Sequence, residues 1–263
     1  MPEPTTDEVY LDTTILVELC IKKGLDAQSI RRVISEYGRA TVAAYALKEF
    51  RAGAMTYVVT LYNRIVGEAN NIQDLFEILD KLDHGGFQRY RQKIALQVIG
   101  SLSGQILDNE PVGSVARHLR DSLYSLIREA WDDAHELGET IEAIACYNDV
   151  GPSYDEATGQ FQMPVCWPNP PGTGCCVALH AHSCKVVDKV IEALASDSRE
   201  ETRKRVAALQ VAPEELTRHQ CRHLGDLAVV LYAPADAQVL STNHRDFMDL
   251  CRILGKSFRN PLR

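Results

Sequence analysis

The amino-acid sequence lacks the features that mark membrane proteins, exported proteins and repeat arrays. No apolar run is long enough to span a lipid bilayer. Residues 1–8 are acidic and contain no apolar stretch of the kind that a signal peptide needs. The chain also contains no internal repeat and no low-complexity segment. We therefore expect a cytoplasmic protein that has no membrane partner.

An excess of positive charge is absent as well. The chain has 28 Lys and Arg against 36 Asp and Glu, which gives a net charge of −8. Because contacts with phosphate need local Lys and Arg, this balance argues against indiscriminate nucleic-acid binding, and any RNA surface must be a local patch. A solvated helical face is the competing explanation for each candidate cluster. The candidates are Lys48 and Arg51 in one cluster, and His244, Arg245, Arg252, Lys256 and Arg259 in the other.

The rest of the composition is that of a globular protein. With 263 residues, 45% of them hydrophobic, the chain can bury a sizeable core as one elaborated domain or as a domain with an insert. Its eight cysteines fit free thiols or metal ligands better than a disulfide framework, which is typical of shorter secreted chains. Thiol redox chemistry at Cys175 and Cys176 is disfavoured because adjacent cysteines lack the C-x-x-C spacing of a reactive pair.

Two segments at opposite ends of the chain have the same pattern of a short apolar strand that runs into polar and acidic residues. Residues 9–11 lead into Asp12, where a helix begins, and residues 237–240 lead into a segment that ends at Asp246. In an open parallel sheet, side chains that leave the carboxyl ends of neighbouring strands converge on one crevice. The two segments can therefore build one acidic pocket although they are remote in sequence.

Two more acids are candidates for the same pocket. Glu49 follows the apolar run 40–46, and Asp226 lies after Gly225 at the start of an apolar helix, where the helix dipole favours a carboxylate. Any one of these acids taken alone is explained by a helix N-cap or a first-turn residue. The four together favour a shared site.

This set of residues resembles the acidic motifs of the PIN-domain family of metal-dependent nucleases. The resemblance rests on Asp12 with the two threonines that follow it, on Glu49, on Asp226 after a glycine, and on residues 241–247. It implies an α/β fold with a central, mostly parallel sheet flanked by helices. Residues 1–53 and 213–263 would form a discontinuous nuclease core, and residues 54–212 would be a large, mostly helical insert.

The resemblance also implies an activity, which is the hydrolysis of phosphodiester bonds in RNA by a metal-dependent endoribonuclease. Clustered carboxylates raise one another's pKa unless a cation neutralises them, and hard oxygen ligands suit Mg²⁺ or Mn²⁺. Such an ion can activate water for attack on phosphorus. The implied catalytic and metal-binding residues are Asp12, Glu49, Asp226 and Asp246, with Asn243 as a further ligand or its neighbour. Residues implied to orient water or phosphate are Thr13, Thr14, Thr242 and Asn243.

The predicted insert begins with helices. Apolar residues at helical spacing predict helices over 55–83, 88–102 and 112–137, and again over 186–209, where a charged, solvated face is formed by Glu200, Glu201, Arg203, Lys204 and Arg205. Between them, residues 144–147 and 161–165 flank a turn-rich segment and predict a short β-hairpin. An antiparallel helical bundle is the simplest packing for the helices.

A Cys/His-rich loop at 146–184 lies inside this region. Thiolate and imidazole side chains can bind structural Zn²⁺ tetrahedrally, although their spacing here matches no standard zinc finger, and a Pro/Gly-rich loop with reduced thiols is the competing interpretation. The candidate zinc ligands are Cys166, Cys175, Cys176, His180, His182 and Cys184.

A second function stays open beside the nuclease. The chain could be a catalytically inactive PIN-like interaction module whose helical insert binds a partner. The partners considered are an RNA substrate, an antitoxin or another protein, and a second copy of the chain in a homodimer. A neighbouring small gene that encodes an antitoxin would favour a toxin.

Overall fold

The computed structural model describes residues 7–69, 112–141, 149–164 and 176–263, together with Asp74, Glu77, Ile78 and Val98. The described strands are β1 (Glu8–Leu11), β2 (Arg39–Ala43), β3 (Glu139–Ile141), β4 (Ser153–Asp155), β5 (Gln160–Gln162), β6 (Gln238–Leu240) and β7 (Ser257–Arg259). The described helices are α1 (Thr13–Leu16), α2 (Leu25–Ile34), α3 (Ala44–Phe50), α4 (Thr56–Glu68), α7 (Val112–Glu136), α8 (Cys176–Ser183), α9 (Val187–Leu194), α10 (Glu200–Leu209), α11 (Arg218–Arg222), α12 (Gly225–Tyr232) and α13 (His244–Leu254). Two π-helical segments, η1 (Val17–Lys22) and η2 (Arg51–Met55), continue α1 and α3.

The central sheet has five strands in the order β3-β2-β1-β6-β7, and each neighbouring pair is parallel. This confirms the predicted α/β fold with a central parallel sheet flanked by helices. Strand β1 is the middle strand, with β2 on one side and β6 on the other, so the strand order reverses beside it. Ligands of open α/β sheets bind in the crevice at the carboxyl ends of the strands at such a reversal.

The middle strands are buried on both faces. Val9, Tyr10 and Leu11 of β1 have no exposed surface, and neither do Val239 and Leu240 of β6. Parallel strands covered by helices have continuous apolar runs of this kind. The strands predicted at both ends of the chain are present as β1 and β6. Each of these apolar runs is short and is followed by a polar residue that can start a helix.

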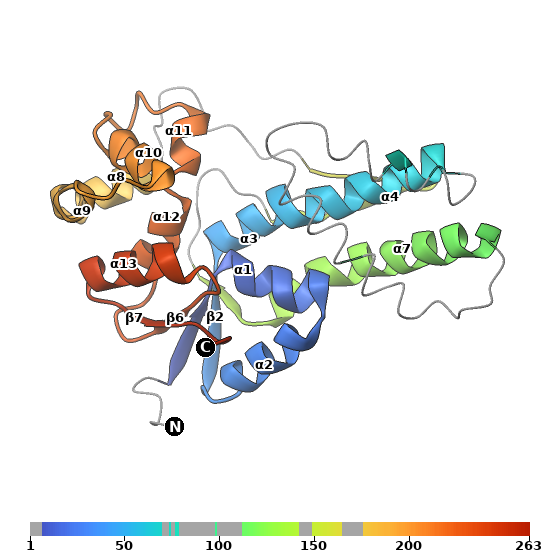
Figure 1. Ribbon diagram of the computed structural model, residues 1–263, viewed down its shortest axis with the longest axis horizontal. Helices are drawn as coiled ribbons and strands as arrows, with labels where there is room; N and C mark the ends of the chain where they lie inside the picture. The colour runs from blue at the N-terminus through green and yellow to red at the C-terminus, as the bar shows by residue number, and fades with distance from the viewer. Residues whose placement is uncertain are drawn as a thin grey trace.

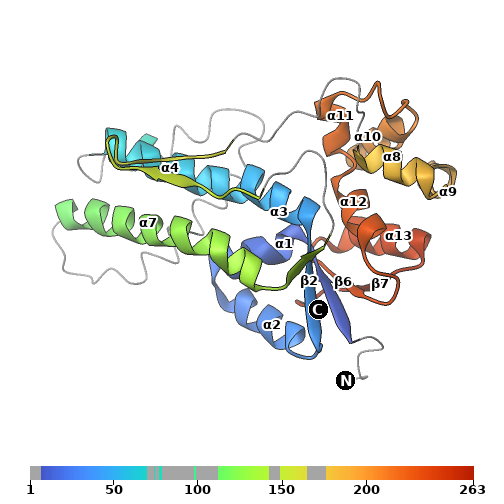
Figure 2. The same ribbon diagram turned by 180° about the vertical axis from the view of Figure 1, so that it is seen from behind.

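Helices α4 and α7 pack side by side and extend away from the sheet, on the side opposite to α8, α9, α10 and α11 (Figures 1 and 2). A β4–β5 hairpin covers α4, and the ring of Phe161 lies edge-on to Tyr62 with centroids 5.1 Å apart. The hairpin was predicted around the correct turn, and β4 is the strand that precedes this turn. Residues 144–147, the predicted first strand, lie outside the described residues. The predicted helix over 88–102 is likewise outside the description, apart from Val98.

The segment predicted as an insert contributes to the central sheet. Strand β3 pairs with β2, with Ala43 opposite Ile141, although it lies within residues 54–212. The predicted helix over 186–209 is present as two helices, α9 and α10, which pack against each other. Among the described helices, none has the length and apolar character required to cross a membrane.

Candidate active site

Asp12 lies at the carboxyl end of β1 and is the N-cap residue of α1. Its Oδ2 atom accepts hydrogen bonds from the Thr14 backbone N–H (3.1 Å), the Thr14 hydroxyl (2.8 Å) and the Ser241 hydroxyl (2.8 Å). Asp12 is buried, with 2% of its surface exposed. Burial raises the pKa of its carboxyl group, and the hydrogen bonds from Thr14 and Ser241 partly oppose that rise.

The ends of β1 and β6 are joined by further hydrogen bonds around Asp12. The backbone N–H of Asp12 donates to the Leu240 carbonyl oxygen at 3.2 Å. The Thr242 backbone N–H donates to the Thr14 hydroxyl oxygen at 3.0 Å, and the Asn243 backbone N–H donates to the Ser241 hydroxyl oxygen at 3.0 Å. Thr14 and Ser241 therefore fix the two strand ends in one arrangement around the carboxylate.

Glu49 reaches the same place from α3. Its Oε2 atom accepts a hydrogen bond of 3.0 Å from the Thr13 hydroxyl. Its Oε1 atom lies against Gly225, where an added Cβ would come within 2.5 Å of it. Burial, followed by the charges of Asp226 and Asp12, raises the pKa of Glu49 to about 8. The absence of a side chain at Gly225 thus permits the close approach of α3 and α12.

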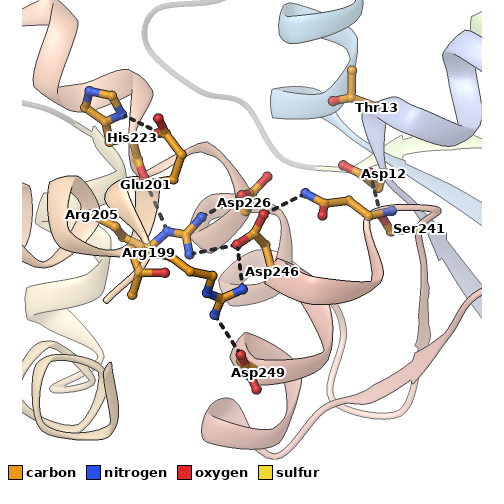
Figure 3. Close-up of polar contacts among 12 residues, drawn as sticks. Asp12, Thr13, Arg199, Glu201, Arg205, His223, Asp226, Ser241, Asp246 and Asp249 are labelled. Atoms are coloured by element: carbon orange, nitrogen blue, oxygen red, sulfur yellow. Dashed lines mark hydrogen bonds and ion pairs between the residues drawn. The ribbon is translucent and has the colours of Figure 1, made fainter. Parts of the chain in front are cut away.

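Asp226 and Asp246 stand in the first turns of α12 and α13, where the N-terminal helix dipole favours a carboxylate. Burial raises the pKa of Asp226 to about 6, an effect that nearby Arg205 opposes and that Asp12 and Asp246 reinforce. The Asn243 side-chain amide donates a hydrogen bond of 3.1 Å to Asp246 Oδ2. In Figure 3, Asp226 and Asp246 lie between Asp12 on one side and Arg205 on the other.

The structure thus brings Asp12, Glu49, Asp226 and Asp246 together at the carboxyl edge of the sheet. The charges of Asp226 and Asp12 contribute to the raised pKa of Glu49, and those of Asp12 and Asp246 contribute to the raised pKa of Asp226. The four threonine and asparagine residues predicted to orient substrate surround them. Thr13, Thr14 and Asn243 make side-chain hydrogen bonds to Glu49, Asp12 and Asp246, and Thr242 makes a backbone hydrogen bond to Thr14.

Two arginines that the sequence analysis did not assign to the site are bound to these acids. Arg205 of α10 contacts Asp226 at 2.6 Å and Asp246 at 4.0 Å, and Arg199 contacts Asp246 at 3.5 Å and Asp249 at 2.9 Å. The prediction that residues 200–205 form a solvated face is wrong for Arg205, which is 3% exposed. A signal for its burial exists in the spacing, because the buried residues Thr202, Arg205 and Leu209 share one face of α10.

Several basic residues that were predicted to form RNA-binding patches contact other parts of the protein instead. Arg51 is buried, donates a hydrogen bond of 2.8 Å to the Val150 carbonyl oxygen and lies 5.9 Å from the Trp131 ring. It is therefore a packing residue and not part of an exposed patch. Arg259 is paired with Glu36 at 2.7 Å, and Lys256 donates to a backbone carbonyl oxygen.

The candidate zinc loop lies largely outside the described residues. Cys166, Cys175 and the side chain of Cys176 lie outside the part of the chain that the structure describes. Among the candidate ligands that are described, Cys184 Sγ lies 3.5 Å from His180 Nε2. The His180 ring also stacks on the Tyr232 ring, with centroids 4.4 Å apart. Cys221 is disulfide-bonded, which departs from the prediction of free thiols, whereas Cys20, Cys184 and Cys251 are free.

The four acids have the donor chemistry of a Mg²⁺ or Mn²⁺ site. Two of them, Asp226 and Asp246, also contact arginine side chains. Within the described ranges, no three His, Cys, Asp or Glu side chains are grouped closely enough to hold an ion without moving. The donors nevertheless fit such an ion, because they are hard carboxylate oxygens. In addition, the negative charges of Asp226 and Asp12 raise the pKa of Glu49. A bound dication would relieve that repulsion.

Comparisons with protein-family models, with curated proteins and with solved structures find no match for this chain. The assignment of a function therefore depends on the geometry and chemistry of the site.

Proposed function

We propose that this chain is a divalent-metal-dependent endoribonuclease with a PIN-like core formed by residues 1–53, residues 213–263 and strand β3, and that the rest of residues 54–212 is a helical insert. The observation that carries the proposal is the convergence of Asp12, Glu49, Asp226 and Asp246 at the strand-order reversal of a parallel sheet. Four carboxylates from four separate helices gather where an open α/β sheet places a ligand.

The electrostatics of the cluster favour a cation. Burial raises the pKa of Asp12, Glu49 and Asp226, and the charges of neighbouring acids add to the rise for Glu49 and Asp226, so the ionised forms are costly without a positive partner. Asp12, Glu49, Asp226 and Asp246 would hold Mg²⁺ or Mn²⁺, with Asn243 beside them. When bound, such an ion supplies a Lewis acid that lowers the pKa of water and stabilises charge on phosphoryl oxygens.

The chain's own residues supply orientation. Thr14 and Ser241 hold one oxygen of Asp12 in place and favour its ionised form through three hydrogen bonds. Thr13 holds Glu49 in the same way, and Asn243 holds Asp246. These contacts fix three carboxylate oxygens before substrate arrives, which reduces the entropy that positioning would otherwise cost.

The test is cleavage of single-stranded RNA resolved on gels, with Mg²⁺, Mn²⁺ or EDTA. We expect cleavage that EDTA abolishes and that Asp12→Asn or Asp226→Asn lowers by about 100-fold, since each removes a charge at the reacting centre. The matched control is Asp236→Asn, which changes an exposed aspartate away from the cluster. Cleavage that survives EDTA or both site substitutions would reject the mechanism.

A second candidate function has its own supporting observation. Asp226 and Asp246 are already bound by Arg205 and Arg199, so the acids have positive partners without a metal. This favours a PIN-like interaction module that retains the fold without the chemistry and binds a partner through residues 54–212. An absence of cleavage on every RNA tested, with an intact fold, would favour this candidate.

A further inference from the structure

Arg205 is a buried cation at one side of the acidic pocket. Its side chain is 4% exposed, and its guanidinium Nη2 lies 2.6 Å from Asp226 Oδ2. The Nη1 atom lies 4.0 Å from Asp246, and the Nε–H group donates to the His223 carbonyl oxygen at 3.3 Å. Figure 3 shows the guanidinium directed at both aspartates. A buried arginine is uncommon unless it is paired, so these contacts define what the side chain does.

The partners of Arg205 are two acids that lie close to each other. Asp226 and Asp246 are close enough that the charge of Asp246 raises the pKa of Asp226, while Arg205 lowers it. Arg199, the other arginine nearby, approaches the same oxygen of Asp246 at 3.5 Å and also binds Asp197 and Asp249. Arg205 is therefore the arginine that faces Asp226, and its guanidinium supplies positive charge where a divalent ion would also supply it.

We propose that Arg205 is an internal counterion that holds Asp226 and Asp246 in place and competes with a divalent cation for them. This inference rests on the proposed function, because it concerns the same acids. Two positive groups cannot share the two carboxylates at short distance without repulsion, so a divalent ion that binds them displaces the guanidinium. Arg205 is a positioning residue in this scheme, and it sets how strongly the pocket binds metal.

The competition gives Arg205 two opposite effects. Without metal, its removal leaves Asp226, whose side chain is 29% exposed, without the guanidinium that lies 2.6 Å away, and breaking a partly buried pair in this way is destabilising. With metal, its removal takes away a repelling charge and a competitor, so affinity for the ion increases. A residue with a merely structural role would have the first effect without the second.

The experiment compares Arg205→Gln and Arg205→Lys in the full chain with a matched control, Arg203→Gln, which removes an exposed arginine from the same helix. Thermal unfolding is followed in EDTA and in Mn²⁺, and Mn²⁺ affinity is measured by calorimetry. In EDTA we expect Arg205→Gln to lower the melting temperature by about 5–15 °C. Combining it with Asp226→Asn should restore at least half of that loss, because the unpaired charge is then gone.

In Mn²⁺ we expect Arg205→Gln to regain its melting temperature and to bind the ion about tenfold more tightly than the wild type. Arg205→Lys keeps the charge, so it and Arg203→Gln should stay near the wild-type affinity. If the wild type binds Mn²⁺ and Arg205→Gln binds it equally or more weakly, the competition is overturned while the proposed function stands. If no variant binds Mn²⁺, both the metal-dependent function and the competition are wrong.

Discussion

The hydroxyl group of Ser241 donates a hydrogen bond of 2.8 Å to Asp12, which lies 229 residues earlier in the chain. The bond joins the carboxyl ends of β1 and β6, where both side chains are buried. It brings the two ends of the sequence into one site and satisfies a carboxylate that has little contact with water. Its removal is therefore a direct test of how the site is held together.

We expect Ser241→Ala to lower the free energy of unfolding by about 1–3 kcal/mol, because Asp12 loses a buried donor. Urea denaturation followed by circular dichroism measures the change. The control is Ser257→Ala, at an exposed position at the start of β7, which should change stability by less than about 0.5 kcal/mol. Equal effects of the two substitutions would contradict a special role for the Ser241 hydroxyl.

The stability of the metal-free protein should fall as pH rises. The pKa of Glu49 is raised from 4.5 to about 8 and that of Asp226 from 3.8 to about 6, so the folded chain binds more protons than the unfolded chain between these values. Unfolding free energy then decreases with pH, at up to about 1.4 kcal/mol per pH unit for each group. The decrease should begin above about pH 4 and end near pH 8.

Urea denaturation in EDTA at several pH values measures this slope. Glu49→Gln removes one titrating group and should flatten the decrease between about pH 6 and 8, whereas Glu214→Gln, at an exposed position, should leave it unchanged. Saturating Mn²⁺ should reduce the slope as well, since a cation stabilises the ionised carboxylates. A stability that rises with pH over this range would contradict the raised pKa values.

Gly225→Ala should disturb the contact between α3 and α12. Alanine usually stabilises a helix relative to glycine, but here its Cβ would lie 2.5 Å from Glu49 Oε1 and 3.0 Å from the Tyr45 ring. We expect a lower melting temperature and, if the pocket binds metal, a weaker affinity for Mn²⁺. Gly53→Ala is the control, because no atom lies within 4 Å of its added Cβ, and it should be neutral or slightly stabilising.

The zinc hypothesis for the loop at 146–184 requires about one Zn²⁺ per chain in protein purified without chelator. The ion should be lost in a Cys175→Ser/Cys176→Ser double variant together with thermal stability, because a structural zinc contributes directly to folding. Inductively coupled plasma mass spectrometry measures the metal content. Protein that is free of zinc and equally stable would contradict the hypothesis and leave the segment as a connector.

The sequence alone determined the parts of the fold that depend on local patterns. Continuous apolar runs predicted β1 and β6, because a strand buried on both faces needs apolar side chains at every position. The polar residue after each run predicted where the strand ends, and Asp12 was placed correctly where a helix begins. Helix periodicity predicted α7 and the α9–α10 region for the same local reason.

Strands β3 and β7 could not be predicted in this way. Each has three residues at an edge of the sheet, which is too short for a periodic pattern to distinguish a strand from a loop. Their partners are fixed by pairing with distant strands, as when Phe258 lies opposite Val239. Such pairing depends on how the chain folds back and not on the local sequence.

Among the charged residues of the site, the acids were predicted from the sequence and the arginines were not. Asp12, Glu49, Asp226 and Asp246 were singled out because their local positions favour carboxylates. Arg205 was assigned to solvent because an arginine is rarely buried unless it is paired, and its partner Asp226 is 21 residues away. Arg51 was misplaced for the same reason, since its contacts with Val150 and Trp131 arise from packing between distant segments. The sequence by itself determined where the acids stand on their elements, and tertiary packing decided which cations reach them, because burial of a charge depends on partners that no local pattern contains.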